Sequence, residues 1–245
     1  MNHYTVEGSG EPLVLLHGGL SDSREWGAQL PALRETYRVF AFDRRGHGAT
    51  PDTHAPFDYD EMAGETVSFL DEVVGGPALL VGWSDGGIVT LLTSLRRPDL
   101  VRRQVLIGVN FHFDGMYPDF EMVDDPAADA NMPLKAMYQS VAPDPAHWPE
   151  FFAKGSHLFT VQPTLTVEDL RAVQTPTLVL AGDDDCILHD HTVALYEHIP
   201  GAQLAIVPGT SHMAQMEKPR LVNELILTFL AETGPPSTIL PMRRR

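Results

Sequence analysis

The feature that most constrains the fold is a repeated alternation between short apolar runs and longer stretches with helical spacing. Gly, Asp or Asn bound the runs, which cover residues 12–16, 37–42, 78–81, 104–109, 177–181 and 204–207. Near-continuous apolar strands that alternate with helices are typical of a parallel sheet covered on both faces. The sequence therefore predicts an α/β fold with a mostly parallel central sheet flanked by helices.

Two segments carry clear helix signals. Asp58 is followed three residues later by Glu61, as in a capping box, which predicts a helix running to about Val74. After Pro219, apolar residues recur at helical spacing up to Leu230. One face of this last segment can therefore bury against the sheet.

The stretch from 111 to 172 differs from the rest of the chain. It has no strand pattern, carries many prolines and is rich in aromatic residues and methionines, which predicts a helical insertion over the edge of the sheet. We expect most of this apolar bulk to form the insertion's own core, and Phe111 and Trp148 to contribute to a substrate pocket. The expected organisation is a core of 1–110 and 173–233, a helical cap of 111–172 and a flexible tail of 234–245.

Composition excludes several classes of function. The formal charge of −16 argues against a nucleic-acid partner, because affinity for phosphates depends on clustered Lys and Arg. No apolar run approaches the ~18 residues of a membrane span. Residues 1–10 lack the pattern of a secretory signal, and the single cysteine, Cys186, cannot form an internal disulfide, so we expect a cytoplasmic protein.

Neither a cofactor nor a metal is expected. No phosphate-binding or dinucleotide motif is present, and the segment 43–48, although rich in Gly and Arg, is interpreted as a structural turn. His189 and His191 are interpreted as the start of a helix rather than as metal ligands, because no further ligands stand at a recognisable spacing. The expected partner is a small-molecule ester, and the expected state is a monomer or a homodimer.

The strongest chemical signal is Gly82-Trp83-Ser84-Asp85-Gly86, a G-x-S-x-G pattern directly after an apolar run and before a helical pattern. A serine on so tight a turn needs a strained backbone and projects its hydroxyl. Larger side chains two positions before or after it would collide with neighbouring backbone, which explains Gly82 and Gly86. The pattern indicates that Ser84 is a nucleophile.

A serine is a poor nucleophile unless a base takes its proton, so a histidine and an acid are required in later loops. Gly182-Asp183-Asp184-Asp185 follows one apolar run, and the loop ending in His212 follows the next. Both loops are expected at the carboxyl ends of strands, where open α/β sheets place their sites. The order Ser, Asp, His is the one expected of a hydrolase elbow.

With these motifs in order, the chain resembles the α/β-hydrolase fold superfamily over about residues 12–231. The remaining matching motifs are Leu15-Leu16-His17-Gly18-Gly19 and Asp43-Arg44-Arg45-Gly46-His47-Gly48. The resemblance implies a catalytic triad of Ser84, His212 and Asp185, the third residue after Gly182. Asp183 or Asp184 could instead bond the turn, and Asp114 is a rival acid.

The resemblance also implies an oxyanion hole formed by the backbone N–H groups of Gly19 and Asp85. Such donors stabilise the negative oxygen that develops during acyl transfer. His17 and His47 are expected to serve the structure. Trp83, beside the nucleophile, is a candidate substrate contact.

Within the family, the elbow with Asp85 after the serine is similar to that of the valacyclovir-hydrolase (biphenyl-hydrolase-like) branch, which is associated with esters of amino acids. A carboxylate beside the nucleophile could pair with a substrate ammonium and would repel an anion. Equally, Asp85 could cap the helix or pair with Arg24 or Arg44. Both interpretations remain open from the sequence.

The sequence therefore predicts a serine hydrolase that cleaves a small carboxylic ester, including an α-amino-acid ester, through an acyl-serine intermediate. A lactone or a carbon-carbon bond could be cleaved by the same triad. A different class, a ligand-binding receptor with slow turnover on the same fold, is a further alternative.

Overall fold

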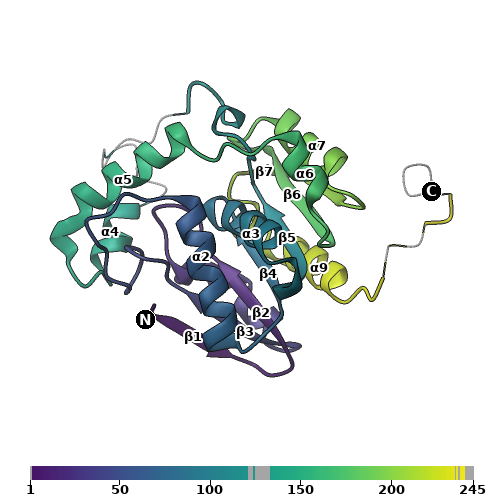
Figure 1. Cartoon of the computed structure of the whole chain (residues 1–245), viewed down its shortest axis with the longest axis horizontal. Helices are drawn as coiled ribbons and strands as arrows, with labels where there is room; N and C mark the ends of the chain where they lie inside the picture. Colours follow the sequence, from purple (N-terminus) through teal and green to yellow (C-terminus); the bar gives the residue numbers. More distant parts are fainter. Residues whose placement is uncertain (1, 121–123, 125–132, 235, 237, 241–245) are drawn as a thin grey trace.

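The computed structural model describes residues 2–120, 124, 133–234, 236 and 238–240, and a seven-stranded sheet forms its centre (Figure 1). The spatial order of the strands is β1-β3-β2-β4-β5-β6-β7. β1 pairs antiparallel with β3, and the other pairings are parallel, which confirms the mostly parallel sheet. The strands are β1 (Tyr4–Glu7), β2 (Glu11–Leu16), β3 (Tyr37–Phe42), β4 (Ala78–Trp83), β5 (Val101–Ile107), β6 (Thr177–Asp184) and β7 (Gln203–Ser211).

Helices connect the strands. The α-helices are α1 (Leu30–Leu33), α2 (Tyr59–Phe69), α3 (Asp85–Arg96), α4 (Leu134–Gln139), α5 (Trp148–Val161), α6 (Val167–Ala172), α7 (His189–His198), α8 (Ala214–Glu217) and α9 (Pro219–Leu230). Short 3-10 turns are η1 (Ser23–Ala28), η3 (Pro98–Leu100), η4 (Phe113–Gly115) and η6 (Pro145–His147), and η2 (Leu70–Val74) is a π-helical turn. In the described part of the chain, no helix has the length and apolarity needed to cross a membrane.

Alternate side chains of each strand enter separate cores on the two faces of the sheet. Val14 and Leu16 of β2 join the core that α2 and α3 cover (Figure 1). Leu13 and Leu15 join the core to which α1 and α9 contribute. Because successive side chains of a strand point to opposite faces, a sheet buried on both sides needs apolar residues at nearly every position. This requirement accounts for the unbroken apolar runs in the sequence.

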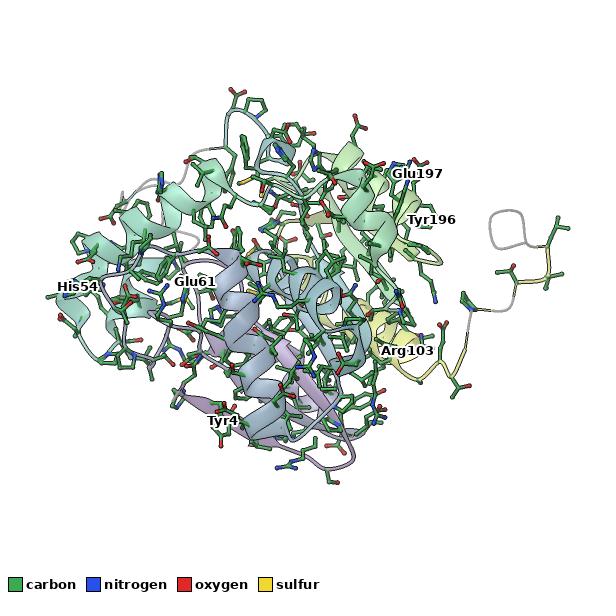
Figure 2. The ribbon with its side chains drawn as sticks, in the orientation of Figure 1. Tyr4, His54, Glu61, Arg103, Tyr196 and Glu197 are labelled. Atoms are coloured by element: carbon green, nitrogen blue, oxygen red, sulfur yellow. The ribbon has the colours of Figure 1, made fainter. Side chains whose placement is uncertain are left out.

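Both predicted helix signals are found in the structure. The Asp58 carboxylate accepts a hydrogen bond from the backbone N–H of Glu61 at 2.9 Å and caps α2, which continues through η2 to Val74. The segment after Pro219 forms α9 and buries its apolar face. Near the amino end of β5, Arg103 lies beside α9 (Figure 2), and its guanidinium carbon Cζ is 5.3 Å from the ring centroid of Phe229.

The stretch 111–172 contains α4, α5 and α6, apart from 121–123 and 125–132, which lie outside the described residues. Trp148 and Phe151 of α5 are fully buried. Asp52, in the loop after β3, accepts hydrogen bonds from His147 at 3.0 Å and Lys154 at 2.8 Å and so ties α5 to the core. Of the expected tail 234–245, residues 235, 237 and 241–245 also lie outside the described part.

Candidate active site

Ser84 lies on the turn between β4 and α3 with a backbone φ of +52°, a conformation that a residue with a side chain rarely adopts. Its N–H donates to the carbonyl of Ile107 at 2.8 Å, and its own carbonyl accepts from Gly87 and Ile88 at the start of α3. Sheet and helix together therefore hold the strained conformation.

The neighbouring glycines allow the close approach that this turn requires. A Cβ on Gly82 would collide with the backbone of Gly86, and a Cβ on Gly86 would collide with the carbonyl of Leu16 in β2. A Cβ on Gly87 would overlap the side chain of Val109. The steric interpretation of the elbow is thus matched by specific contacts.

His212 and Asp185 lie together at the carboxyl ends of β7 and β6. The Nδ1 of His212 is 2.7 Å from Oδ1 of Asp185, which also accepts from the N–H of Ile187 at 3.0 Å. Burial, the largest effect, would raise the pKa of Asp185, but the hydrogen bond and charge of His212 together with backbone N–H donors keep the pKa below its usual value. Asp185 is thus an ionised acceptor at neutral pH.

The environment also affects the pKa of His212. Burial alone would lower this pKa, whereas hydrogen bonds with Asp185 and with the thiol of Cys186 raise it, and the net shift is upward. The Nε1 of Trp83 donates to the carbonyl of His212 at 2.8 Å and fixes the backbone of its loop. Ring and backbone of His212 are therefore both held by neighbours.

The rival acids have other partners. Asp183 is exposed, and its Oδ1 accepts from the N–H groups of Gly209 and Thr210 at 2.6 and 3.1 Å, so it bonds the β7 turn. Asp114 is exposed and contacts His112 at 2.6 Å and His191 at 3.5 Å. Of the acids weighed from the sequence, Asp185 is the one bonded to His212, and it is 4% exposed.

Sequence reasoning missed the buried acid that holds the Gly18-Gly19 loop. Glu25, 5% exposed in η1, accepts from the N–H of Gly18 at 2.9 Å and from the hydroxyl of Ser21 at 2.6 Å. Burial raises the pKa of Glu25 to about 8, although both hydrogen bonds and the charge of Arg44 oppose the shift. No local pattern identifies Glu25, because its partner is defined only by the folded loop.

Arg44 completes the support of this loop. Its guanidinium is fully buried and donates to the carbonyls of His17 and Gly18 at 2.6 and 3.1 Å. Burial lowers the pKa of His17 well below its usual value, and the charge of Arg44 adds to the effect. His17 is neutral and its Nε2 accepts from the N–H of Arg44 at 3.2 Å, in agreement with a structural role.

Asp85, the first residue of α3, points toward Gly19. Its Oδ1 accepts from the hydroxyl of Tyr59 at 2.7 Å, and a Cβ on Gly19 would lie 2.5 Å from its Oδ2. Burial raises the pKa of Asp85, while Arg44 and Tyr59 act in the opposite direction. Arg24, one of the partners considered from the sequence, is bonded to Asp22 instead.

Ser84, Asp85, Gly19 and His212 line one cavity of about 60 Å³. Cys186 lies in the same wall, and the apolar part of the lining includes Met116, Phe120, Leu134 and Phe159. A larger hollow of about 810 Å³ lies at the amino ends of β5, β6 and β7, and its described lining contains neither Ser, His nor Cys. The smaller cavity is therefore the one with nucleophile chemistry.

Three of the four residues expected to contact substrate do not line this cavity. Trp83 is 4% exposed and packs on Gly18 and His212. Trp148 is fully buried against aromatic neighbours in the 111–172 stretch, and Phe111 stacks on His191 at a centroid distance of 4.5 Å. Asp85 is the one of the four in the lining. The three aromatic side chains pack against other protein side chains, as large apolar residues usually do.

Known proteins resemble this chain over most of its length. "Serine hydrolase BPHL" of Homo sapiens is 29% identical over 241 residues, which cover 93% of this chain and 82% of the relative. The solved structure of a serine hydrolase involved in carbazole degradation (CarC enzyme) superimposes with a TM-score of 0.77 at 26% identity over 94% of each chain. The structure of the meta-cleavage product hydrolase CumD of Pseudomonas fluorescens superimposes with a TM-score of 0.81 at 23% identity over 95% of each chain, which shows the shared fold.

The family pattern itself covers the elements described above. The alpha/beta hydrolase family matches residues 13–225, from β2 through the elbow and the His212 loop into α9. This range includes most of β2 and all of the strands from β3 to β7. The chain belongs to the alpha/beta hydrolase family.

Proposed function

We propose that the protein is a serine hydrolase that cleaves small carboxylic esters through an acyl-serine intermediate. The observation that carries the proposal is the 2.7 Å bond between His212 Nδ1 and Asp185 Oδ1, with His212 lining the same cavity as Ser84. A base oriented by an acid, beside a hydroxyl on a strained turn, is the arrangement that activates a serine. The name of the BPHL relatives, serine hydrolase, agrees with this proposal.

In the proposed reaction, Oγ of Ser84 attacks the ester carbonyl while His212 takes the hydroxyl proton. Asp185 stabilises the imidazolium that forms, and the N–H groups of Gly19 and Asp85 bind the oxyanion. The protonated His212 then gives its proton to the departing alcohol. Water, activated by His212, attacks the acyl-serine, and the carboxylic acid is released.

The stretch 111–172 supplies much of the cavity wall, through Met116, Phe120, Leu134 and Phe159. For this reason we propose that it acts as a cap that shapes the substrate site and excludes water. Excluding water strengthens the electrostatic interactions at the reacting carbonyl.

The central test is labelling by a serine-reactive fluorophosphonate, combined with hydrolysis of a panel of p-nitrophenyl esters and a lactone. Wild type is expected to be labelled at Ser84 and to hydrolyse short acyl esters. Ser84→Ala should lose both label and turnover while retaining its unfolding temperature. Ligand binding with turnover that Ser84→Ala leaves unchanged would instead favour a receptor.

Within the esters, we propose a preference for those that carry an α-amino group. Asp85 lines the cavity, only one of its carboxylate oxygens is bonded to Tyr59, and the other lies beside Gly19. A carboxylate with negative charge beside the nucleophile favours an ammonium and disfavours an anion.

Asp85→Asn tests this preference, because asparagine keeps the size of the side chain and an acceptor for Tyr59. The ratio of kcat/KM for an α-amino ester to that for its des-amino analogue should fall about 10- to 100-fold, as expected for a charged hydrogen bond. Tyr59→Phe is the matched control: it retains the carboxylate and should retain the preference. An unchanged ratio in Asp85→Asn would assign the carboxylate to structure alone.

A further inference from the structure

Next to the proposed nucleophile, three different metal-binding groups converge. Asp185, Cys186 and His212 each offer one ligand atom, and these atoms lie within 4.8 Å of one another. In the described part of the chain, no other trio of His, Cys, Asp or Glu side chains comes this close. The trio adds Cys186, whose thiol interacts with His212 but takes no part in the proposed proton transfers, to two residues that do.

The backbone holds these donors in place without a ligand. The N–H of Tyr117 donates to the carbonyl of Cys186 at 2.9 Å, and Met116 forms a β-bridge with Ile187, so the β6 loop is anchored at the cysteine and at the residue after it. The bond from Trp83 to the carbonyl of His212 anchors the other loop. Donors that are already ordered bind an ion at little cost in conformational entropy.

One donor has an unused acceptor site. Oδ2 of Asp185 is buried and has no hydrogen-bond partner in the protein, whereas Oδ1 is bonded to both His212 and Ile187. A buried carboxylate oxygen without a partner carries a desolvation penalty that a cation would remove. Cys186 is half-buried and lines the cavity together with His212, so an ion can reach these two groups from the cavity, and the Asp185 carboxylate lies against His212.

The donor set selects the class of ion. Thiolate, imidazole and carboxylate are the ligands of zinc, with metal-donor distances of about 2.0–2.3 Å, whereas magnesium and calcium prefer oxygen alone. Tetrahedral coordination at these lengths separates the donors by about 3.3–3.7 Å. In the structure, His212 Nδ1 and Asp185 Oδ1 are 2.7 Å apart, and the three ligand atoms all lie within 4.8 Å of one another. The separations that zinc requires fall between these two values.

We propose that Asp185, Cys186 and His212 form an inhibitory site for Zn²⁺ or the softer Cd²⁺. The ion takes the place of the proton shared between His212 Nδ1 and Asp185, and Cys186 binds as thiolate. The thiol proton is released to solvent, and the ring proton moves from Nδ1 to Nε2. Because Nε2 then carries a proton, it cannot accept the one from Ser84, and the inhibition follows from this change of tautomer.

The inhibition rests on the proposed function, but the binding does not, so the two are tested separately. Cys186 is the only cysteine in the chain, so any cadmium-thiolate charge-transfer band in the ultraviolet reports on this one residue. Chelator-treated wild type is titrated with Cd²⁺ and should develop the band at one equivalent. Ser84→Ala should develop it equally, and Cys186→Ser should not.

Ligation by His212 is tested in the same titration. His212→Gln and Asp185→Asn should each weaken Cd²⁺ binding at least about 10-fold, since even outer-shell partners of a metal typically contribute 10- to 100-fold. Far-ultraviolet circular dichroism checks that both variants are folded. A band that is absent in wild type, or that is equally strong in both variants, would overturn the site.

The functional arm measures ester hydrolysis with increasing Zn²⁺. Wild type should be inhibited and should recover when a chelator removes the ion. In Cys186→Ser the concentration of Zn²⁺ for half inhibition should rise at least about 10-fold. Equal sensitivity of the two proteins contradicts the inhibitory role. A protein without esterase activity that still gives the cadmium band would instead contradict the proposed function alone.

Discussion

On the β2 and β3 side of Ser84, Glu25 and Arg44 are buried and interact mainly with backbone groups. On the β6 and β7 side, Asp185 and His212 are bonded to each other, and His212 lines the cavity. Glu25 and Arg44 hold the N–H and C=O groups of the Gly18 loop. Asp185 and His212 hold each other. We call these the oxyanion side and the base side. Fixed dipoles need rigid support, whereas a proton carrier needs a titratable partner and access to the substrate.

The largest expected effect lies on the base side. Asp185→Asn removes the charge that orients His212 and stabilises its imidazolium, so kcat should fall about 10⁴-fold. Asp183→Asn is the control of the same chemistry two residues away, and it should change kcat little, because Asp183 bonds only the β7 turn. Ester kinetics on both variants check the assignment. Comparable losses in the two would mean that Asp185 is not the orienting acid.

A smaller effect is expected on the oxyanion side. Glu25→Ala leaves the N–H of Gly18 and the guanidinium of Arg44 without their buried acidic neighbour, so the loop that carries Gly19 should shift. We expect kcat to fall about 10²-fold, the lower end for loss of an oxyanion donor, and the free energy of unfolding to fall by about 1–3 kcal/mol.

Glu25→Gln is the matched variant, because its amide can still accept from Gly18 and donate to Ser21. It should keep kcat within about 10-fold of wild type. Kinetics together with urea unfolding of both variants separate loop position from charge. Retention of full activity by Glu25→Ala would remove Glu25 from the support of the loop.

The raised pKa of Glu25 predicts that the stability of the folded protein depends on pH. The folded protein raises the pKa of Glu25 from its ordinary 4.5 to about 8, so between these values the folded form retains a proton that the unfolded chain has released. The free energy of unfolding therefore falls as pH rises through this window. Relative to Glu25→Gln, wild type should lose stability steadily over the window, as measured by urea unfolding at several pH values. A constant difference between the two proteins would contradict the raised pKa.

The smallest effect is expected where the two sides meet. Trp83 packs on Gly18 of the oxyanion side and donates to the carbonyl of His212 on the base side. Trp83→Phe keeps most of the ring packing but loses this hydrogen bond, which contributes about 0.5–1.5 kcal/mol, so kcat should fall by about 10-fold or less. Steady-state kinetics provide the measurement. A loss as large as that of Asp185→Asn would show that the two sides are not separable.

The two sides also differ in how far the sequence predicts them. Apolar runs and the order of the elbow, acid and histidine motifs predict the sheet and bring the base-side loops to one edge, because parallel strands end there. β1 was missed, since Tyr4–Glu7 is short and pairs antiparallel at the edge. Glu25 and the Tyr59–Asp85 bond were missed because they depend on tertiary approach; the second joins residues 26 positions apart. Local sequence patterns do not indicate such pairs.

Ser84 and His212 line the same cavity, which has a consequence for the order of events in the proposed reaction. One histidine must give its proton to the departing alcohol before it can take a proton from the hydrolytic water. In the proposed reaction, release of alcohol therefore precedes release of acid, and an ester with a slowly hydrolysed acyl group should give a burst of alcohol equal to the number of active sites.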